Sequence, residues 1–192
     1  MSKAKIIFGV FLITLMLSTL LFSAFPSLYS NDKTGKIYKQ VDTNFNFLKN
    51  ENSDYVLLYF GYVGCTTICS PALTQINQIY KELNADRFSF YFINLQVNTP
   101  EEIVDQFAKH FNKNFNGIYL NNDKIKKITN KLNVKYVPSM LDKNEIDHTG
   151  FLHVLKKEEK NIYQQKFLYT TKPFEIQEII KDLNNTLGAS LW

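Results

Sequence analysis

One segment constrains the fold of this 192-residue chain more than any other. Residues 55–60 (Tyr-Val-Leu-Leu-Tyr-Phe) form an unbroken apolar run, which is typical of a strand buried on both faces of a sheet. A glycine-bearing loop follows, and from Cys69 onward apolar residues recur at helical spacing, at Ala72, Leu73, Ile76, Tyr80 and Leu83. Strand, short loop and helix in direct succession indicate an α/β protein.

The loop and the helix start hold the two cysteines of the sequence, Cys65 and Cys69. Residues four apart on one helical turn lie about 6 Å apart, which a disulfide can bridge and which lets two thiolates bind one metal ion. The partial positive charge at a helix N-terminus favours thiolate over thiol. Two thiolates with few other ligands favour Cu(I), although Zn(II) accepts the same groups. The pair predicts a redox-active disulfide or a soft-metal site, and a metal site needs a third ligand.

The composition fits a single globular domain and excludes several classes of function. With 45% hydrophobic residues the chain can bury one ordinary core and needs no second domain. The net charge of +4 is mild, and no basic stripe is interleaved with aromatic residues, so we expect no nucleic-acid partner. The sequence also lacks a phosphate-binding glycine loop and paired carboxylates of the kind that turn over a substrate, so an enzyme is not the first expectation.

The N-terminal segment predicts export and membrane anchoring. Lys3 and Lys5 precede residues 6–25, an uncharged stretch long enough to cross a bilayer as a helix. A cleavable signal peptide is the alternative, because two small residues lie near the end of the run, but Phe22 stands where cleavage requires a small residue. We expect a single-pass anchor over residues 1–27 in the inner (cytoplasmic) membrane, with the domain on the periplasmic or outer side.

The remainder divides into a tether over 28–40, a domain over 41–187 and a tail over 188–192. The expected elements after the cysteines are a strand at 88–95, a helix from 100, a helix from about 122, a hairpin of 151–155 with 161–169 after a charged turn, and a last helix begun by Pro173. Their order is that of a thioredoxin-like three-layer α/β sandwich, preceded here by the single transmembrane helix. Open α/β sheets place their sites at the carboxyl ends of the strands, where the cysteine loop begins.

Two local expectations are specific. Thr99 is expected to cap the third helix, with Pro100 as its first helical residue and a glutamate three residues after the cap. Residues 136–147 are expected to form an irregular polar loop, and long loops in compact domains are usually functional.

Three histidines are available as a third ligand. His110 stands near the end of an amphipathic helix, outside its apolar stripe, which is typical of a solvated residue. His153 lies inside an apolar strand and is expected to be packed or hydrogen-bonded within the sheet. His148 closes the long loop just before that strand, and by itself it is interpreted as a loop residue that caps the strand.

Two motifs resemble a known family. Phe60-Gly61-Tyr62-Val63-Gly64-Cys65-Thr66-Thr67-Ile68-Cys69 resembles the F-G-Y-x-x-C-x-x-x-C signature of the Sco/SenC family of membrane-anchored copper chaperones. Asp147-His148-Thr149 is similar to the D-H-S/T motif of that family, and residues 98–101 resemble its D-T-P-E helix start. The resemblance covers about residues 41–187, in the same order of elements.

The resemblance implies a fold, a ligand set and a partner. Family members are thioredoxin-like, and Cys65 and Cys69 match their thiolate ligands, which also form a reversible disulfide. His148 matches their third ligand, an imidazole. The family binds Cu(I) or Cu(II) and helps to assemble the dinuclear copper centre of cytochrome c oxidase. It acts by delivering copper to the copper-receiving subunit or by reducing the cysteines of that subunit.

The sequence departs from the family pattern beside the ligands. Thr66 and Thr67 stand where the family commonly has proline and aspartate, and Ser70 separates Cys69 from Pro71. No departure removes a ligand. Residues beside thiols tune their redox potential, so these positions bear on potential and on docking.

Other interpretations stay open at the level of sequence. The cysteines also fit a membrane-anchored thiol–disulfide oxidoreductase or redox sensor that uses no metal, although thioredoxin-type enzymes usually place two residues between their cysteines and not three. Tyr62 is expected to form an aromatic lid over the loop. Asp147 either accepts a hydrogen bond from the His148 ring or merely ends the polar loop. Met140 is a possible thioether ligand, but a lone methionine usually packs.

Overall fold

The computed structural model describes residues 3, 7–9, 11–19, 35–38, 42–43, 45–140, 142, 145–159 and 162–188. Residues 3, 7–9 and 11–19 are helical, and no described helix combines the length and the hydropathy that spanning a bilayer requires. Much of the expected anchor (1–27), tether (28–40) and tail (188–192) lies outside the described residues. The chain forms two compact units, 1–33 and 34–192, and the second contains the sheet and the candidate site.

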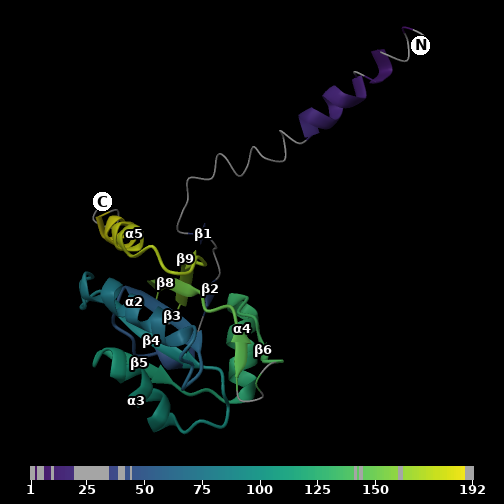
Figure 1. Ribbon diagram of the computed structural model, residues 1–192. Helices are drawn as coiled ribbons and strands as arrows, with labels where there is room; N and C mark the ends of the chain where they lie inside the picture. The colour runs from purple at the N-terminus through teal and green to yellow at the C-terminus, as the bar shows by residue number, and fades with distance from the viewer. Residues whose placement is uncertain are drawn as a thin grey trace. The chain divides into compact units, whose positions relative to one another are not determined.

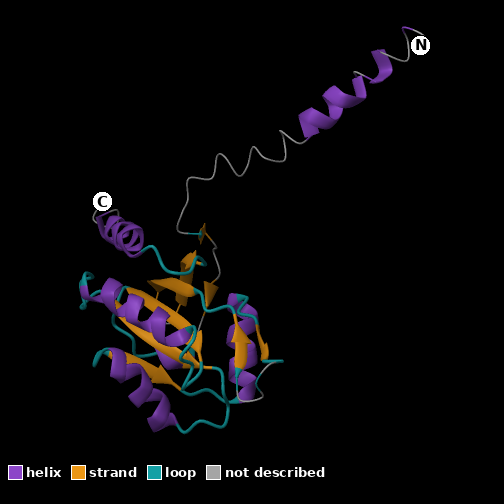
Figure 2. Ribbon diagram, in the orientation of Figure 1, coloured by secondary structure: helices purple, strands orange, loops and turns teal. Residues whose placement is uncertain are grey.

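The second unit is built on one mixed sheet (Figures 1 and 2). In the part of the chain that the structure describes, the sheet has seven strands in the order β1-β9-β8-β3-β4-β5, with β2 beside β9. Strand β3 is central, parallel to β4 and antiparallel to β8, and β4 is parallel to β5. The bounds are β1 Lys36–Tyr38, β2 Asp42–Thr43, β3 Tyr55–Gly61, β4 Phe88–Asn94, β5 Phe115–Ile118, β8 Leu152–Glu159 and β9 Ile162–Tyr169.

Helices cover both faces of the sheet and complete three layers. The side chains of α2 (Cys69–Lys81), α3 (Glu101–Phe111) and α5 (Ile176–Gly188) share one hydrophobic cluster with one face. Those of α4 (Asn122–Leu132) and the short 3-10 helix η1 (Asn46–Leu48) share a second cluster with the other face. The mixed α/β architecture predicted from the sequence is therefore present.

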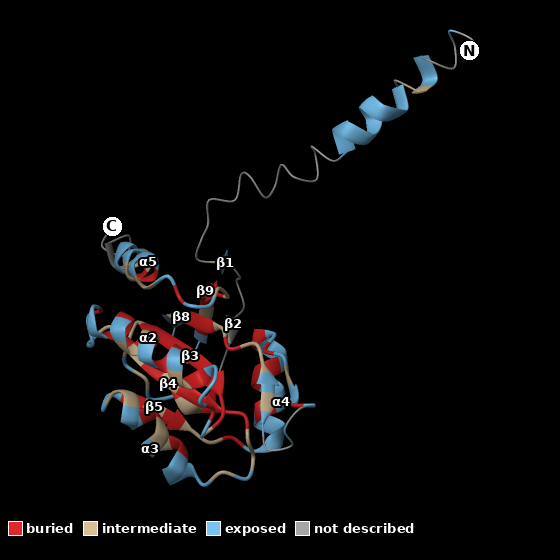
Figure 3. Cartoon of the chain, viewed as in Figure 1, coloured by how far each residue is buried: buried red, intermediate tan, exposed pale blue. Residues whose placement is uncertain are grey.

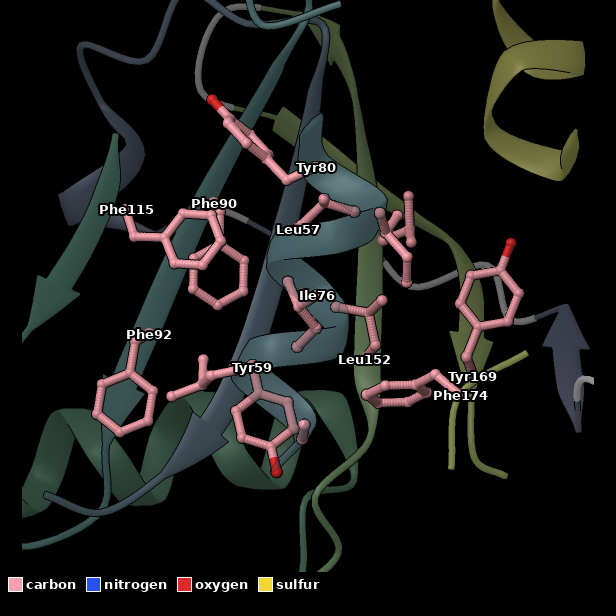
Figure 4. Close-up of a cluster of buried hydrophobic side chains, with 14 of the residues drawn as sticks. Leu57, Tyr59, Ile76, Tyr80, Phe90, Phe92, Phe115, Leu152, Tyr169 and Phe174 are labelled. Atoms are coloured by element: carbon pink, nitrogen blue, oxygen red, sulfur yellow. The ribbon is translucent and has the colours of Figure 1, made fainter. Parts of the chain in front are cut away.

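Strand β3 is buried along its whole length (Figure 3). Its side chains alternate between the two clusters, with Leu57 and Tyr59 on the α2 face and Val56, Leu58 and Phe60 on the α4 face. Figure 4 shows the α2-face cluster, in which the Tyr59 hydroxyl points away from the other labelled side chains. The unbroken apolar run in the sequence is thus the signature of a central strand, and the cysteine loop leaves its carboxyl end.

The predicted N-cap of α3, Thr99, is wrong by one residue. Pro100 has extended backbone (φ −57°, ψ 145°) and occupies the N-cap position itself, so the helix begins at Glu101. The Thr99 hydroxyl hydrogen-bonds to the Gln96 side chain at 3.3 Å and does not cap the helix. A proline gives the cap position no side-chain acceptor, and the preceding threonine is held by its own turn.

The prediction of an irregular loop over 136–147 is also wrong. Strands β6 (Tyr136–Pro138) and β7 (Ile146–His148) pair antiparallel, with Tyr136 opposite His148. We call these two strands and their connection the β6–β7 hairpin. Each strand has three residues, most of them exposed or half-buried, and such short strands show too few alternations for a period of two to be recognised.

Smaller differences lie at the ends of other elements. Strand β1 pairs with β9, so the sheet already begins at Lys36, inside the range expected to be tether. Strand β8 continues to Glu159 through the residues expected to form a charged turn, and β9 follows at Ile162. Helix α5 begins at Ile176, three residues after Pro173.

Candidate metal centre

The end of β3 is shaped around the sulfur of Cys69, the first residue of α2. A Cβ placed on Gly61 would lie 2.6 Å from Cys69 Sγ and 3.0 Å from the Phe92 ring. No side chain fits there without displacing the sulfur or the ring. Gly61 is therefore a residue of the site that the sequence contained only as part of a motif.

The loop between β3 and α2 is held by a buried side chain from the neighbouring strand. Asn94, the last residue of β4, is fully buried; its Oδ1 accepts the Val63 N–H at 3.3 Å and its Nδ2 donates to the Gln96 carbonyl at 2.6 Å. The loop turns at Gly64, whose φ of +87° lies in the left-handed region that favours glycine. Sequence reasoning missed Asn94. Its one signal was a polar residue at the end of a buried strand parallel to β3.

Both cysteines are unpaired thiols and both are buried, Cys65 at 2% exposure and Cys69 at 0%. The Cys69 backbone N–H donates to Cys65 Sγ at 3.3 Å, so the first free amide of α2 is directed at sulfur. A hydrogen bond from the Cys69 thiol is the main factor that lowers the pKa of Cys65; desolvation opposes it, and His148 and backbone N–H groups lower it further. The same thiol–thiolate hydrogen bond, together with desolvation, raises the pKa of Cys69. The reduced pair thus carries its thiolate on Cys65.

The β6–β7 hairpin brings His148 to the sulfurs. His148 ends β7, and the next residue, Thr149, donates its N–H to the Lys135 carbonyl at 3.0 Å. His148 Nε2 lies 3.3 Å from Cys69 Sγ. The ring is enclosed edge-on by Tyr59 and Tyr62, with centroids 6.4 Å and 6.1 Å away and interplanar angles of 86°. The last residue of β7 therefore meets a cysteine that lies 79 residues earlier in the chain.

Together the ligand atoms of Cys65, Cys69 and His148 lie within 4.8 Å of one another. Metal bonds near 2.3 Å to sulfur and 2.0 Å to nitrogen would place three ligand atoms about 3.5–4 Å apart around one ion. The observed group needs only a small closure to reach that geometry. Two thiolates and one imidazole are a soft donor set that suits Cu(I).

The other residues considered as ligands do not join this group. Asp147 is exposed, and His148 Nδ1 is buried with no hydrogen-bond partner among the described residues, so Asp147 does not hold the ring. Met140 is 98% exposed on the hairpin connection. His110 is exposed at the end of α3, and His153 is buried in β8, where its Nδ1 lies 3.2 Å from Gln165 Oε1. Both of these histidines have the environments that the sequence predicted.

Tyr62 is buried and packs against the His148 ring, as expected for an aromatic lid. Desolvation is the main factor that raises the pKa of the Tyr62 hydroxyl, and a hydrogen bond with Cys65 adds to it. The phenol therefore remains protonated and available as a hydrogen-bond donor to a thiolate.

Two further residues reach the centre without a sequence signal. Tyr59 is fully buried in β3, and its hydroxyl has no hydrogen-bond partner by geometric criteria among the described residues. Its pKa is raised by desolvation and then by the negative charge of Cys69 and Cys65. Lys172, an exposed residue between β9 and α5, has a pKa lowered by desolvation, and electrostatic interaction with the two cysteines opposes that shift. Tyr59 precedes Cys65 by six residues, whereas Lys172 lies 103 residues after Cys69 in the sequence.

Comparison with known proteins agrees with the motifs. The SCO1/SenC family matches residues 28–186, which is most of the chain. The chain belongs to the SCO1/SenC family. The match begins within the expected tether, consistent with a sheet that starts at Lys36.

Relatives in sequence and structure share this assignment. An SCO2-like protein of Rickettsia felis is 27% identical over 161 residues, which cover 79% of this chain and 77% of that protein. The solution structure of apo Sco1 from Thermus thermophilus has a TM-score of 0.64 at 24% identity, covering 78% of this chain and 92% of that one. Arabidopsis thaliana ScoI with copper bound has a TM-score of 0.59 at 18% identity, covering 71% and 89%. At these identities the solved structures show that the SCO1/SenC chain has the fold of Sco proteins.

Proposed function

We propose that this SCO1/SenC protein binds one copper ion through Cys65, Cys69 and His148 and hands it to the copper-receiving subunit of cytochrome c oxidase. The observation that carries the proposal is the convergence of the three ligand atoms within 4.8 Å. The ligands come from two motifs, and His148 lies 79 residues after Cys69. The copper-bound Arabidopsis relative supports the identity of the metal, and the family resemblance supports the oxidase as acceptor.

Copper is the cargo here, and the arrangement of its ligands bears on delivery. Both sulfurs are buried, whereas His148 is half-buried on a mostly exposed hairpin. An acceptor ligand therefore approaches most easily from the imidazole side. Replacing the imidazole first leaves copper on two thiolates until the acceptor supplies further ligands, so transfer proceeds by ligand exchange without a free ion.

The test is copper binding by the full-length chain in detergent, reduced and kept free of oxygen. Titration of Cu(I) against a chromophoric competitor should give one ion per chain. His148→Ala should weaken Cu(I) binding by about a hundredfold. Removal of an outer-sphere partner of a metal ligand costs up to about that much, and removal of the ligand itself should cost no less. His110→Ala is the matched control, since His110 is exposed on α3, and it should bind as the unmodified chain does. Full affinity in His148→Ala would overturn the ligand assignment.

Delivery is tested separately. The copper-loaded chain is mixed with a soluble copper-receiving domain of the oxidase, the two are separated, and the copper in each is measured. We expect copper to move to the acceptor faster than it dissociates into a chelator solution. A transfer rate equal to the rate of dissociation would show that the chain only stores copper.

A second function is supported by the state of the thiols. Cys65, as thiolate, can attack a disulfide of the acceptor, and one acceptor sulfur leaves as thiolate. Cys69 then attacks the mixed disulfide, so that Cys65 and Cys69 become oxidised and the acceptor gains two thiols. A chain that reduces a disulfide-bonded acceptor peptide under copper chelation, and does so equally well as His148→Ala, would favour this reductase activity.

Export and anchoring complete the proposal. Residues 1–27 anchor the chain in the inner membrane in a single pass, the following residues up to Lys36 connect the anchor to the sheet, and the domain that begins there lies on the periplasmic or outer side. The uncharged stretch 6–25 behind Lys3 and Lys5 supports this orientation. In membrane fractions, carbonate should not extract the chain, and added protease should reach the domain only after the outer permeability barrier is opened. Release of the chain by carbonate would refute the anchor.

A further inference from the structure

Lys172 approaches the metal centre from a part of the chain remote from every ligand. It lies between β9 and α5, and its ammonium end is directed at Gly150, two residues beyond His148. A Cβ placed on Gly150 would overlap Lys172 Nζ and would lie 3.0 Å from Lys172 Cε and 3.2 Å from the Tyr59 hydroxyl oxygen. The ammonium and the phenol oxygen thus converge on the space that the absent side chain of Gly150 leaves.

Tyr59 gives this convergence a second, independent support. Its side chain is fully buried, and its hydroxyl has no oxygen or nitrogen hydrogen-bond partner among the described residues; the Cys69 sulfur is the group with which it interacts. A buried hydroxyl without a partner is costly, so such a group is expected to face a charged or metal-binding site. Tyr59 also packs edge-on against His148 and interacts electrostatically with Cys69 and Cys65. The Tyr59 ring therefore contacts His148, and its hydroxyl faces the same Gly150 position as the ammonium of Lys172.

The charge of the occupied site explains why a cation is needed. Cu(I) with two thiolates and a neutral imidazole carries a net charge of −1, whereas Cu(II) with the same ligands is neutral. An uncompensated charge among buried groups is unfavourable. The N-terminus of α2 supplies only about half a positive charge. Lys172 interacts electrostatically with both cysteines and can supply the rest.

We propose that Lys172 is the counter-charge of the copper–dithiolate complex and that it selects Cu(I) over Cu(II). This inference rests on the proposed function. The ammonium is held beside Gly150 and the Tyr59 hydroxyl, where it stabilises the anionic Cu(I) complex and has little effect on the neutral Cu(II) complex. Lys172 is a positioning residue, since it acts through its charge and does not bind the metal.

The experiment compares Lys172→Gln, Lys172→Arg and Lys113→Gln in the full-length chain. Lys113 is the matched control, because it is an exposed lysine that precedes β5, at the opposite edge of the sheet from the cysteine loop. Affinities for Cu(I) and Cu(II) are measured by competition, and the potential of the bound copper couple is measured directly. Thermal unfolding and a thiol count show that each variant is folded and reduced.

In Lys172→Gln we expect Cu(I) affinity to fall about tenfold at an effective dielectric suited to a partly exposed charge, with Cu(II) affinity nearly unchanged. A tenfold fall in the ratio of Cu(I) affinity to Cu(II) affinity lowers the potential of a one-electron couple by about 59 mV. Lys172→Arg should restore most of the loss, and Lys113→Gln should show none.

Three results would overturn the inference. The first is an unchanged Cu(I)/Cu(II) ratio in Lys172→Gln while the unmodified chain binds copper, which leaves the proposed function intact. The second is an equal loss in Lys172→Arg, which would assign the effect to shape. The third is an unchanged ratio with slower transfer to the acceptor, which would place Lys172 at a partner contact. Failure of the unmodified chain to bind copper would instead refute the proposed function itself.

Discussion

The two halves of the metal centre are built in opposite ways. The sulfur half stands on β3, a strand buried along its length, and on the first turn of α2, and the buried Asn94 supports its loop. The imidazole half stands on the β6–β7 hairpin, two strands of three residues each that form a sheet of their own and are mostly exposed or half-buried. A firmly held pair of sulfurs thus faces a ligand on a weakly held support. The contrast teaches that retention of metal and release of metal can be assigned to different parts of one fold.

The largest difference expected between the two halves is in copper affinity. Cys65→Ser together with Cys69→Ser should lower Cu(I) affinity by about a thousandfold or more, because hydroxyls are poor ligands for a soft ion. His148→Ala should lose less, since both thiolates remain. Competition titration measures both variants, and circular dichroism confirms that they are folded. Equal losses in the two variants would mean that the halves contribute alike.

Hydrogen exchange measures how firmly each half is held. Without copper, the amides of β6 and β7 should exchange much faster than those of β3, since exposed short strands open locally. Opening the hairpin breaks the site, so copper at a hundred times its dissociation constant should slow hairpin exchange by about a hundredfold, equivalent to 2.7 kcal/mol. Mass spectrometry of peptides from 136–148 and 55–61 gives the comparison. Equal rates of hairpin amide exchange with and without copper would show that His148 does not bind the ion.

Gly61→Ala tests the sulfur half by itself. The added methyl would meet Cys69 Sγ and the Phe92 ring, and overpacking of this kind costs about 1–3 kcal/mol of unfolding free energy. Gly64→Ala is the control: its Cβ would meet nothing within 4 Å, and only its left-handed backbone is strained, at about 1 kcal/mol. Urea unfolding measures both, and only Gly61→Ala should also reduce copper affinity. A larger loss of stability in Gly64→Ala would refute the packing argument.

The smallest effect concerns the two thiols, whose pKa values should differ widely. The Cys65 pKa is lowered, so its thiolate persists as the pH falls below the ordinary thiol pKa of about 8.5 and is lost only near the lower folded-state value. The stability that Cys65 contributes is likewise present above 8.5 and declines as the pH falls. The Cys69 pKa is raised, so its thiol stays protonated above 8.5. Ultraviolet thiolate absorbance of the reduced chain should show one early ionisation, and Cys69→Ala should move it upward. Two thiol ionisations with pKa values near 8.5 would contradict the hydrogen bond between the Cys69 thiol and the Cys65 thiolate.

Much of the sulfur half could be predicted from sequence because its signals are local. The run 55–60, the helical spacing after Cys69 and the cysteine spacing each lie within a few turns of chain. The third ligand was different. His148 was distinguishable from His110 and His153 only through the family motif, since its approach to Cys69 joins residues 79 apart.

What the sequence could not predict depends on contacts across elements. Asn94, on β4, supports the loop that follows β3. Lys172 reaches Gly150 from the segment between β9 and α5. The hairpin was missed because three-residue strands have no readable period, and β1 was missed because an edge strand of three residues resembles the polar segment around it. In each case the decisive interaction is with a distant partner, which no window along the chain contains.

The two phenol rings around His148 have a consequence for timing. An imidazole that packs edge-on against two buried phenol rings has little room to rotate about its own side-chain bonds. It leaves the sulfurs when the backbone beneath it shifts, and such movements belong to the microsecond-to-millisecond range, far slower than the flip of a free ring. We therefore expect opening of the contact between His148 and Cys69 to follow the movement of the β6–β7 hairpin.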